Sequence, residues 1–206
     1  AATGGLDTAH AEIVADLEAP RQPATAAGII VEALRRRREA GAAPFTVLSC
    51  DNLPHNGAVA ARVFGEFAAA VDPALGRWVR DNVAFPATMI DRIVPATTDA
   101  DRAEVATLLG LEDAGPVVAG PFLQGGVEDR FAGPRPPLEL GGAQFVSDVA
   151  TYERKKLRML NGSHSMMASL GYLSGHEFVA QVMGDPAFVR FVRSAMAEEI
   201  APTLER

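Results

Sequence analysis

A long helical stretch, residues 148–175, constrains the fold of this chain most strongly. Its sequence is DVATYERKKLRMLNGSHSMMASLGYLSG, and polar residues recur in it at helical spacing. At about 100° per residue, Glu153 lies roughly 60° from Lys156 around the helix axis. On the same scale His164 lies at roughly 80° and Asn161 at roughly 140°. We therefore expect one helix with these four polar side chains on one side.

Two features of this stretch favour a chemical role. Lys155 and Lys156 are the only lysines among 19 basic residues, so arginine is used everywhere else. A lysine can lose its proton when it is desolvated, whereas a guanidinium cannot. Asn161 and Gly162 are both poor helix formers, and glycine costs about 1 kcal/mol relative to alanine in a helix interior. The alternative is a surface lysine pair and a broken helix with a buried, hydrogen-bonded histidine, and spacing alone leaves both interpretations open.

The chain divides at a loop-rich passage, AGPRPPLELGGAQFVSDV, which is rich in proline and glycine. Before it the pattern predicts an α/β part, residues 1–147, and after it an all-helical part, residues 148–206. In the α/β part we expect helices over residues 24–41, 56–72, 73–83 and 98–109, and strands over 44–50, 115–122 and 143–146. Residues 123–131 are predicted as helix or loop, because Gly125 and Gly126 weaken either choice. In the helical part we expect further helices over residues 176–184 and 185–199, with Phe178, Val179, Val182 and Met183 in the core together with Met166 and Met167.

Two polar residues of the α/β part are candidates for a site. The run PFTVLSC, residues 44–50, is typical of a strand buried in a parallel sheet, and Asn52 follows its carboxyl end, where open α/β sheets bind ligands. Asp91 interrupts an apolar run, which is costly unless the carboxylate is paired. Asp91 therefore either meets a partner from elsewhere or faces a polar cleft. Asn56 is a plausible N-cap of the next helix, and His55 and Asn56 could equally be loop and cap residues only.

Composition and charge exclude several classes of function. The formal charge of −7 and the pI of about 5.1 give no electrostatic footprint for nucleic acid. The arginine run, residues 35–38, is more simply a helix cap and solvated face than a binding patch. Four histidines without metal-ligand spacing predict no bound zinc.

Cysteine usage and hydropathy point to a cytoplasmic protein. Cys50 is alone, so no internal disulfide can form and a reducing compartment is expected. No apolar run approaches the roughly 20 residues needed to span a bilayer, so no membrane partner is expected. The N-terminus has neither an initiator methionine nor a signal peptide, and residues 1–20 do not resemble the start of a fold. We therefore expect a piece of a longer chain.

Three separated motifs carry a resemblance to a known family. They are SCDNLPHNG at residues 49–57, FPATMIDRIVP at residues 85–95 and YERKKLRMLNGSHS at residues 152–165. Together they resemble the polyol-specific long-chain dehydrogenases, the mannitol dehydrogenase family. This resemblance implies a metal-independent, NAD- or NADP-dependent oxidoreductase with a Rossmann-like domain followed by a helical domain, and a substrate between them.

The resemblance also implies roles for particular residues. Lys156 is similar to the family's general acid/base, and Asn52 and Asn161 to the amides that stabilise a developing alkoxide. These roles agree with elementary chemistry, because alcohol oxidation removes a proton while charge builds on oxygen. A lysine with an ordinary pKa of about 10.4 is a poor base at neutral pH, but burial of a lysine disfavours its charged form. Hydrogen-bond donors fixed at the oxygen could contribute on the order of 3 kcal/mol.

Three further roles follow from the resemblance: His164 and Asp91 would bind substrate, and Glu153 would relay protons to and from the lysine. The chain also departs from the family pattern. Gly120 and Gly125 replace an acid and a tryptophan in GPFLQGGVED, which puts local packing and substrate fit in question. No GxGxxG turn occurs, so no cofactor-binding residue is assigned, and the resemblance places that turn upstream and more substrate residues downstream.

The leading hypothesis is thus hydride transfer between a sugar alcohol or aldonate and its ketose or keto-uronate, of the mannitol 2-dehydrogenase or fructuronate reductase type. The partner would be a small sugar or uronate, with no preference predicted between NAD and NADP or among oligomeric states. The missing glycine-rich turn and the two glycine replacements favour a rival hypothesis, a non-catalytic remnant that acts as a binding or oligomerisation module. A third hypothesis is a sugar-binding protein that uses Asn52 and Asp91 without chemistry.

Overall fold

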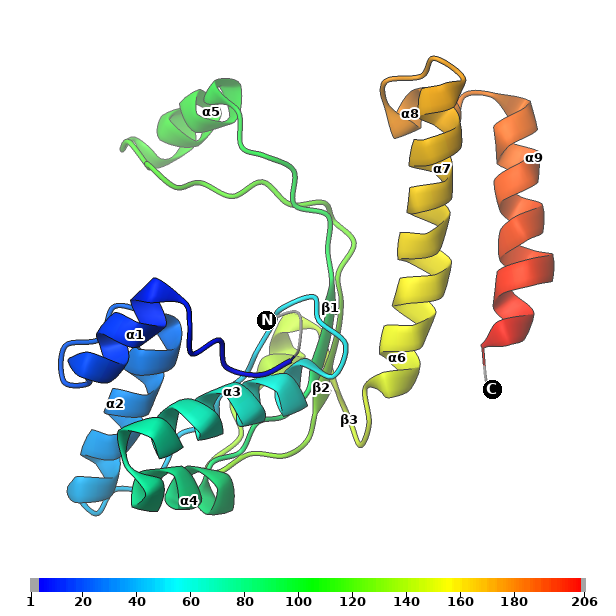
Figure 1. Cartoon of the computed structure of the whole chain (residues 1–206). Helices are drawn as coiled ribbons and strands as arrows, with labels where there is room; N and C mark the ends of the chain where they lie inside the picture. Colours follow the sequence, from blue (N-terminus) through cyan, green and yellow to red (C-terminus); the bar gives the residue numbers. More distant parts are fainter. Residues whose placement is uncertain (1–3, 205–206) are drawn as a thin grey trace. The chain divides into compact units, whose positions relative to one another are not determined.

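The computed structural model describes residues 4–204 and divides into two compact units, Ala1–Ser147 and Asp148–Arg206 (Figure 1). The first unit combines helices with a small mixed sheet. Within the described residues of the second unit, helix is the only regular secondary structure.

Four of the five α-helices in the first unit lie where the sequence predicts helices. The five are α1 (Ala11–Glu18), α2 (Ala26–Glu39), α3 (Asn56–Val71), α4 (Pro73–Asn82) and α5 (Asp99–Leu109). Thr25 caps α2 by accepting from the Gly28 amide, and Asp72 caps α4, with Pro73 at its first position. Thr98 and Asp101 form a capping box at the start of α5. Helix α1 was not predicted, although it lies within residues 1–20.

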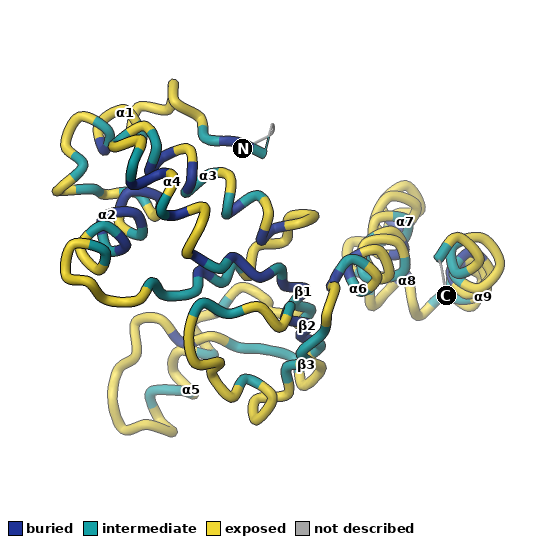
Figure 2. The backbone as a smooth tube through the Cα atoms, turned by 90° about the horizontal axis from the view of Figure 1, so that it is seen from below, coloured by how far each residue is buried: buried dark blue, intermediate teal, exposed yellow. Residues whose placement is uncertain are grey.

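The core of the first unit lies between α2, α3 and α4. Leu34, Phe67, Leu75 and Val79 are each at most 1 % exposed. Figure 2 shows the buried backbone concentrated where these helices face one another. A Cβ added at Gly76 of α4 would lie 2.6 Å from the Cβ of Ala69 in α3, so the two helices approach closely at a glycine. This packing gives α3 a fixed place, and α3 begins at the loop that carries Asn52.

The sheet of the first unit has the strand order β1-β2-β3. Strand β1 (Thr88–Asp91) pairs antiparallel with β2 (Gln124–Glu128), and β2 pairs parallel with β3 (Ala143–Val146). Strand β3 occupies the predicted residues, and β2 lies where helix or loop was predicted. The register places Asp91 opposite Gln124 at the end of the β1–β2 pair.

Two predicted strands are not strands. Residues 44–50 and 115–122 have no assigned strand or helix, although both runs are apolar and β-branched. The amide of Val47 donates to the carbonyl of Ala84 at 3.0 Å, but residues 44–50 join no ladder. An apolar run becomes a strand only where another strand completes its hydrogen bonds. These two strand predictions are therefore wrong, and the sheet of residues 4–147 is small and mixed, whereas the predicted α/β part followed by a helical part is confirmed.

Helix α5 stands on an arm that leaves the sheet after β1 and returns before β2 (Figure 1). The two sides of the arm are joined by hydrogen bonds from the Gly120 amide to the Ile93 carbonyl, 2.9 Å, and from the Thr97 hydroxyl to the Pro116 carbonyl, 2.8 Å. No residue of α5 is buried.

The arginine run lies in the last turns of α2, as predicted, and its guanidinium groups pair with groups of the same unit. Arg35 and Arg36 contact Glu32 at 2.6 and 2.8 Å. Arg37 donates to the Ala43 carbonyl, and Arg38 lies 3.9 Å from Asp72. These guanidinium groups form ion pairs and hydrogen bonds with carboxylates and carbonyls of the same unit.

Asp16 ties α1 to the start of α2. It is 3 % exposed and accepts hydrogen bonds from the amides of Ala24 and Thr25 and from the Thr25 hydroxyl, at 2.8, 2.9 and 2.5 Å. Burial raises the pKa of this carboxyl, but the three donors outweigh burial and hold the pKa below its ordinary 3.8. A lowered folded-state pKa gives stability that is present above the unfolded-state value and lost as pH falls through the folded-state value.

We expect Asp16→Asn to lower the free energy of unfolding at pH 7 by about 2 kcal/mol, because an amide cannot accept all three hydrogen bonds. We also expect the variant to lose less stability than the parent protein between pH 5 and pH 2, because the titrating carboxyl is gone. Urea denaturation at several pH values measures both effects. Asp7→Asn, at an exposed position, serves as the control, and equal acid sensitivity of Asp16→Asn and the parent would contradict the assignment.

The second unit begins with a continuous helical run. It consists of α6 (Ala150–Lys155), a π-helical segment (Lys156–Asn161) and α7 (Gly162–Leu173). Then follow α8 (Val179–Val182), α9 (Pro186–Ser194), a second π-helical segment (Ala195–Ile200) and a 3₁₀ turn (Ala201–Thr203). The prediction of one long helix over residues 148–175 is confirmed in outline, and so is the helix beginning at Pro186.

The predicted apolar face of residues 176–184 is only partly buried. Helix α8 is short, Val182 is 2 % exposed, and Phe178 and Met183 are 61 % and 43 % exposed. Val182 packs against α7 so closely that a Cβ added at Gly171 would overlap its Cγ2 atom. Gly171 therefore allows α7 and α8 to touch, and the prediction of core positions for Phe178 and Met183 is wrong.

Among residues 4–204, no helix is long and apolar enough to cross a membrane.

Candidate functional site

Four of the predicted site residues lie along the helical run α6–α7. Glu153 lies in α6, Lys156 and Asn161 are the first and last residues of the π-helical segment, and His164 lies in the first turn of α7. The Gly162 amide bonds to the carbonyl of Leu157, five residues back, as a π-turn requires. A π-turn takes one residue more than an α-turn, so residues five apart come back to the same side of the axis.

The π-helical segment changes the geometry that the sequence predicts. On a regular α-helix, Asn161 would stand roughly 140° from Lys156. The wide turn brings residues five apart closer in angle, so it reduces this separation. Glu153 precedes Lys156 by three residues and His164 follows Asn161 by three, and residues three apart on a helix are neighbours. Glu153, Lys156, Asn161 and His164 therefore form one stripe, which is tighter than the sequence alone indicates.

Burial varies along this stripe. Glu153 is 8 % exposed, Lys156 and Asn161 are partly buried, and His164 is exposed. The stripe thus places a carboxylate, an amine, an amide and an imidazole in succession. Such a series can pass a proton between a carboxylate and an amine, while the amide and imidazole donate or accept hydrogen bonds.

The other two predicted residues, Asn52 and Asp91, lie in the first unit. Asn52 is exposed in the loop between residues 44–50 and α3, and its backbone amide is 2.8 Å from Asp51 Oδ1. Asp91 is the last residue of β1 and is partly buried. Among residues 4–204 its carboxylate has no hydrogen bond or ion pair, and Arg92 beside it donates instead to the Gly120 carbonyl at 3.0 Å.

Asn56 has a part that the sequence did not predict. Its backbone is the first residue of α3, His55 occupies the N-cap position, and the Asn56 side chain does not cap the helix. Instead the buried amide reaches the loop before it and the start of β1. The prediction of Asn56 as an N-cap is wrong, and Gly57 after it marks a close contact between α3 and residues 85–87.

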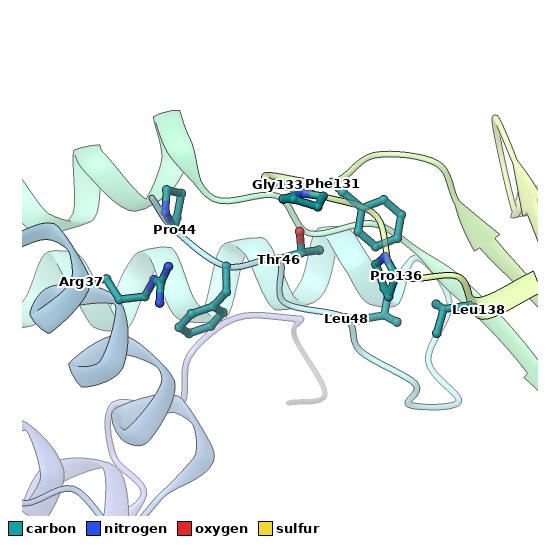
Figure 3. Close-up of a pocket in the computed structure, with 10 residues that line it drawn as sticks. Arg37, Pro44, Thr46, Leu48, Phe131, Gly133, Pro136 and Leu138 are labelled. Atoms are coloured by element: carbon teal, nitrogen blue, oxygen red, sulfur yellow. The ribbon is translucent and has the colours of Figure 1, made fainter. Parts of the chain in front are cut away.

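A cavity of about 470 Å³ lies elsewhere in the first unit, between residues 44–48 and 131–138 (Figure 3). Its walls are mainly apolar, with the Arg37 guanidinium at one side and Thr46 within it. None of the six predicted site residues lines it. The chemistry predicted from the sequence is therefore not placed in this cavity.

The two glycine replacements have room around them. A Cβ at Gly120 would have its nearest neighbour at 3.7 Å, and one at Gly125 would touch Ile90 Cδ1 at 3.4 Å. Neither position requires glycine to let another backbone segment approach closely.

Within residues 4–204, no group of three His, Cys, Asp or Glu side chains is arranged to hold a metal ion, and the absence of a metal stays a prediction.

Comparison with known proteins gives matches along nearly the whole chain. The family model described as the mannitol dehydrogenase Rossmann domain matches residues 2–140, and that of the mannitol dehydrogenase C-terminal domain matches residues 148–206. D-mannonate oxidoreductase of Escherichia coli is 49 % identical over 204 residues, which are 99 % of this chain and 42 % of the relative.

Two solved structures are also similar. The substrate-free crystal structure of a D-sorbitol dehydrogenase matches with a TM-score of 0.91 at 43 % identity, over 99 % of this chain and 42 % of that one. The ternary complex of Pseudomonas fluorescens mannitol 2-dehydrogenase with NAD and D-mannitol matches with a TM-score of 0.84 at 44 % identity, over 97 % of this chain and 40 % of that one. This chain spans about two fifths of the length of these relatives.

Proposed function

This chain belongs to the mannitol dehydrogenase family, and from that premise we propose that it takes part in reversible hydride transfer between a sugar alcohol or aldonate and its ketose or keto-uronate. Support for the proposal comes from the stripe of Glu153, Lys156, Asn161 and His164 along one helical run, in which Lys156 and Asn161 bound a π-helical segment. The stripe contains an amine that can transfer a proton and side chains that can form hydrogen bonds. Alcohol oxidation needs both kinds of group.

In the proposed reaction Lys156 acts as the general acid/base. During reduction its ammonium gives a proton to the carbonyl oxygen of the ketose as that carbon gains a hydride, and during oxidation the neutral amine takes the hydroxyl proton. A positioned general acid or base contributes about 10²- to 10⁴-fold in rate. Glu153, three residues before Lys156, exchanges the proton between the amine and water.

The developing negative charge on the substrate oxygen needs neutral donors. We assign this role to the side-chain amides of Asn161 and Asn52, which donate without adding a charge of their own. His164 and Asp91 would bind the remaining hydroxyl groups of the sugar. This assignment requires the loop of Asn52 and the stripe of Lys156 to meet at one substrate oxygen.

The cofactor is a nicotinamide dinucleotide, which when bound supplies or accepts the hydride. The P. fluorescens relative is seen with NAD, and a relative from Gluconobacter oxydans is named polyol:NADP oxidoreductase. A dinucleotide is held by a glycine-rich turn between a strand and a helix. The sequence has no such motif, so no residue of this chain is assigned to the phosphates.

The test is a titration with NADH of the full-length protein that contains this sequence, followed by addition of fructose or fructuronate. The expected result is saturable NADH binding, seen in the cofactor's fluorescence, and loss of NADH absorbance only when sugar is present. Sugar binding without NADH dependence would favour a non-catalytic sugar-binding protein. Absence of both NADH binding and turnover would favour a non-catalytic module.

A further inference from the structure

The side chains of Asn56 and Thr88 are joined in a dense buried contact. Each residue is 2 % exposed. Asn56 Nδ2 donates to the Asp51 carbonyl at 3.0 Å, to the Thr88 carbonyl at 3.0 Å and to Thr88 Oγ1 at 3.1 Å. Asn56 Oδ1 accepts from the Thr88 amide at 2.9 Å, and Thr88 Oγ1 donates to the Ser49 carbonyl at 2.6 Å. Both ends of the amide are thus used, and its orientation is fixed.

These hydrogen bonds hold a loop to a strand. The carbonyls of Ser49 and Asp51 belong to the segment that leads into Asn52, and Asn56 itself ends that loop. Thr88 begins β1, and Asp91 ends it. The buried contact therefore ties the loop that carries Asn52 to the strand that ends at Asp91.

Burial does little to hold this loop in place. Residues 50–55 are all exposed. His55 has φ 54° and ψ 39°, which is the left-handed conformation, and it is the only residue other than glycine with positive φ among residues 4–204. For a residue with a side chain this conformation costs about 1 to 2 kcal/mol, so the surrounding contacts must hold it.

The strand side of the contact is held independently. Glu128 of β2 accepts from the Ala87 amide at 3.0 Å and donates its own amide to the Ala87 carbonyl at 2.9 Å. Arg130 donates to the Phe85 carbonyl at 2.8 Å. Loss of the contact between Asn56 and Thr88 is therefore expected to release the loop and to leave β1 in place.

We propose that Asn56 and Thr88 are positioning residues that hold the Asn52 amide in place for the reacting oxygen. The inference rests on the proposed function, because it depends on the role proposed there for Asn52 as a hydrogen-bond donor to the substrate oxygen. A hydrogen-bond donor contributes to catalysis only when it is fixed before the reaction, since a mobile amide must be ordered at the transition state. Asn56 and Thr88 act through Asn52 and do not touch substrate themselves.

The test uses Thr88→Val, which keeps the shape of the side chain and removes the hydroxyl, and Thr88→Ser, which restores the hydroxyl. Cys50 is the only cysteine of the chain and is exposed in the loop, so it accepts a nitroxide spin label. We expect Thr88→Val to sharpen the spectrum of the label, which reports faster loop motion. In the intact protein we expect kcat to fall by roughly 10- to 100-fold, less than the 10²- to 10³-fold typical of losing a donor outright, with little change in KM for NADH.

Thr88→Ser is expected to recover most of the kcat and the broad spectrum. Asp16→Asn is the matched control, because it removes buried hydrogen bonds in the same unit but contacts neither the loop nor β1. Equal loss of kcat in Thr88→Val and Asp16→Asn, or an unchanged label spectrum in Thr88→Val, would overturn the positioning role. Absence of turnover in the unchanged intact protein would overturn the proposed function, whereas the label spectra would still show whether the contact holds the loop.

Discussion

Replacing Lys156 by alanine is expected to lower kcat/KM by about 10²- to 10⁴-fold in the intact protein, which is the usual contribution of a general acid or base. Folding should be preserved, because Lys156 is only partly buried and alanine has the highest helix propensity. Steady-state kinetics with NADH and fructose or fructuronate measure the loss. Circular dichroism and the thermal midpoint Tm measure the folding.

The neighbouring lysine provides a matched control. Lys155 is exposed and precedes the π-helical segment, so Lys155→Ala removes the same charge one residue away, and we expect turnover within about two-fold of the parent. Lys156→Arg keeps the positive charge but cannot release a proton at neutral pH. Near-normal turnover in Lys156→Arg would show that the residue acts through its charge, and the proton-transfer mechanism would have to be given up.

Much of the first unit is predictable because its signals are local. Thr25, Asp72 and Thr98 each precede a helix and accept from its first turn, and Pro73 follows Asp72 at the position where a missing amide costs nothing. Such signals depend on residues within three or four positions. These signals can therefore be recognised in the sequence without knowledge of the rest of the fold.

The failed strand predictions concern contacts that are not local. Residues 44–50 and 115–122 have the composition of buried strands, but a strand also needs a neighbour with free amides and carbonyls in register. Strand β2 shows the opposite case, because its glycines weaken the local signal, yet Gly125 and Gly126 pair with β1 and β3 on both sides. Pairing, and not propensity, decides which segments form the sheet.

The site shows the same division between local and distant information. The residue types of the stripe were predictable from spacing, and Asn161-Gly162 stood out as a weak point in the helix. The sequence did not show that this weakness coincides with a π-helical segment, which alters the angle between Lys156 and Asn161. The part played by Asn56 depends on Thr88, 32 positions further along, and no pattern near Asn56 indicates it.

The second large expected effect is a loss of stability on replacing one of two glycines in α3. Gly57→Ala is expected to lower the free energy of unfolding by roughly 3 kcal/mol, at the upper end of the usual cost of overpacking. A Cβ at Gly57 would lie 2.7 Å from the Ala87 amide nitrogen, 2.7 Å from the Phe85 carbonyl oxygen and 2.8 Å from the Pro86 carbonyl carbon. All three are backbone atoms, so no rotation of a side chain can relieve the overlap.

The same substitution eight residues later should have the opposite sign. A Cβ at Gly65 would meet only Arg80 Cγ, at 3.6 Å, which is an ordinary contact. Gly65→Ala is therefore expected to stabilise the protein by about 0.5 to 1 kcal/mol, because alanine favours the helix and restricts the unfolded chain. Urea denaturation of both variants measures the difference. If Gly57→Ala proved as stable as Gly65→Ala, α3 could not approach residues 85–87 as closely as described. The contact that joins Asn56 to Thr88 would then lose its support, because Gly57 is the residue that brings Asn56 within reach of β1.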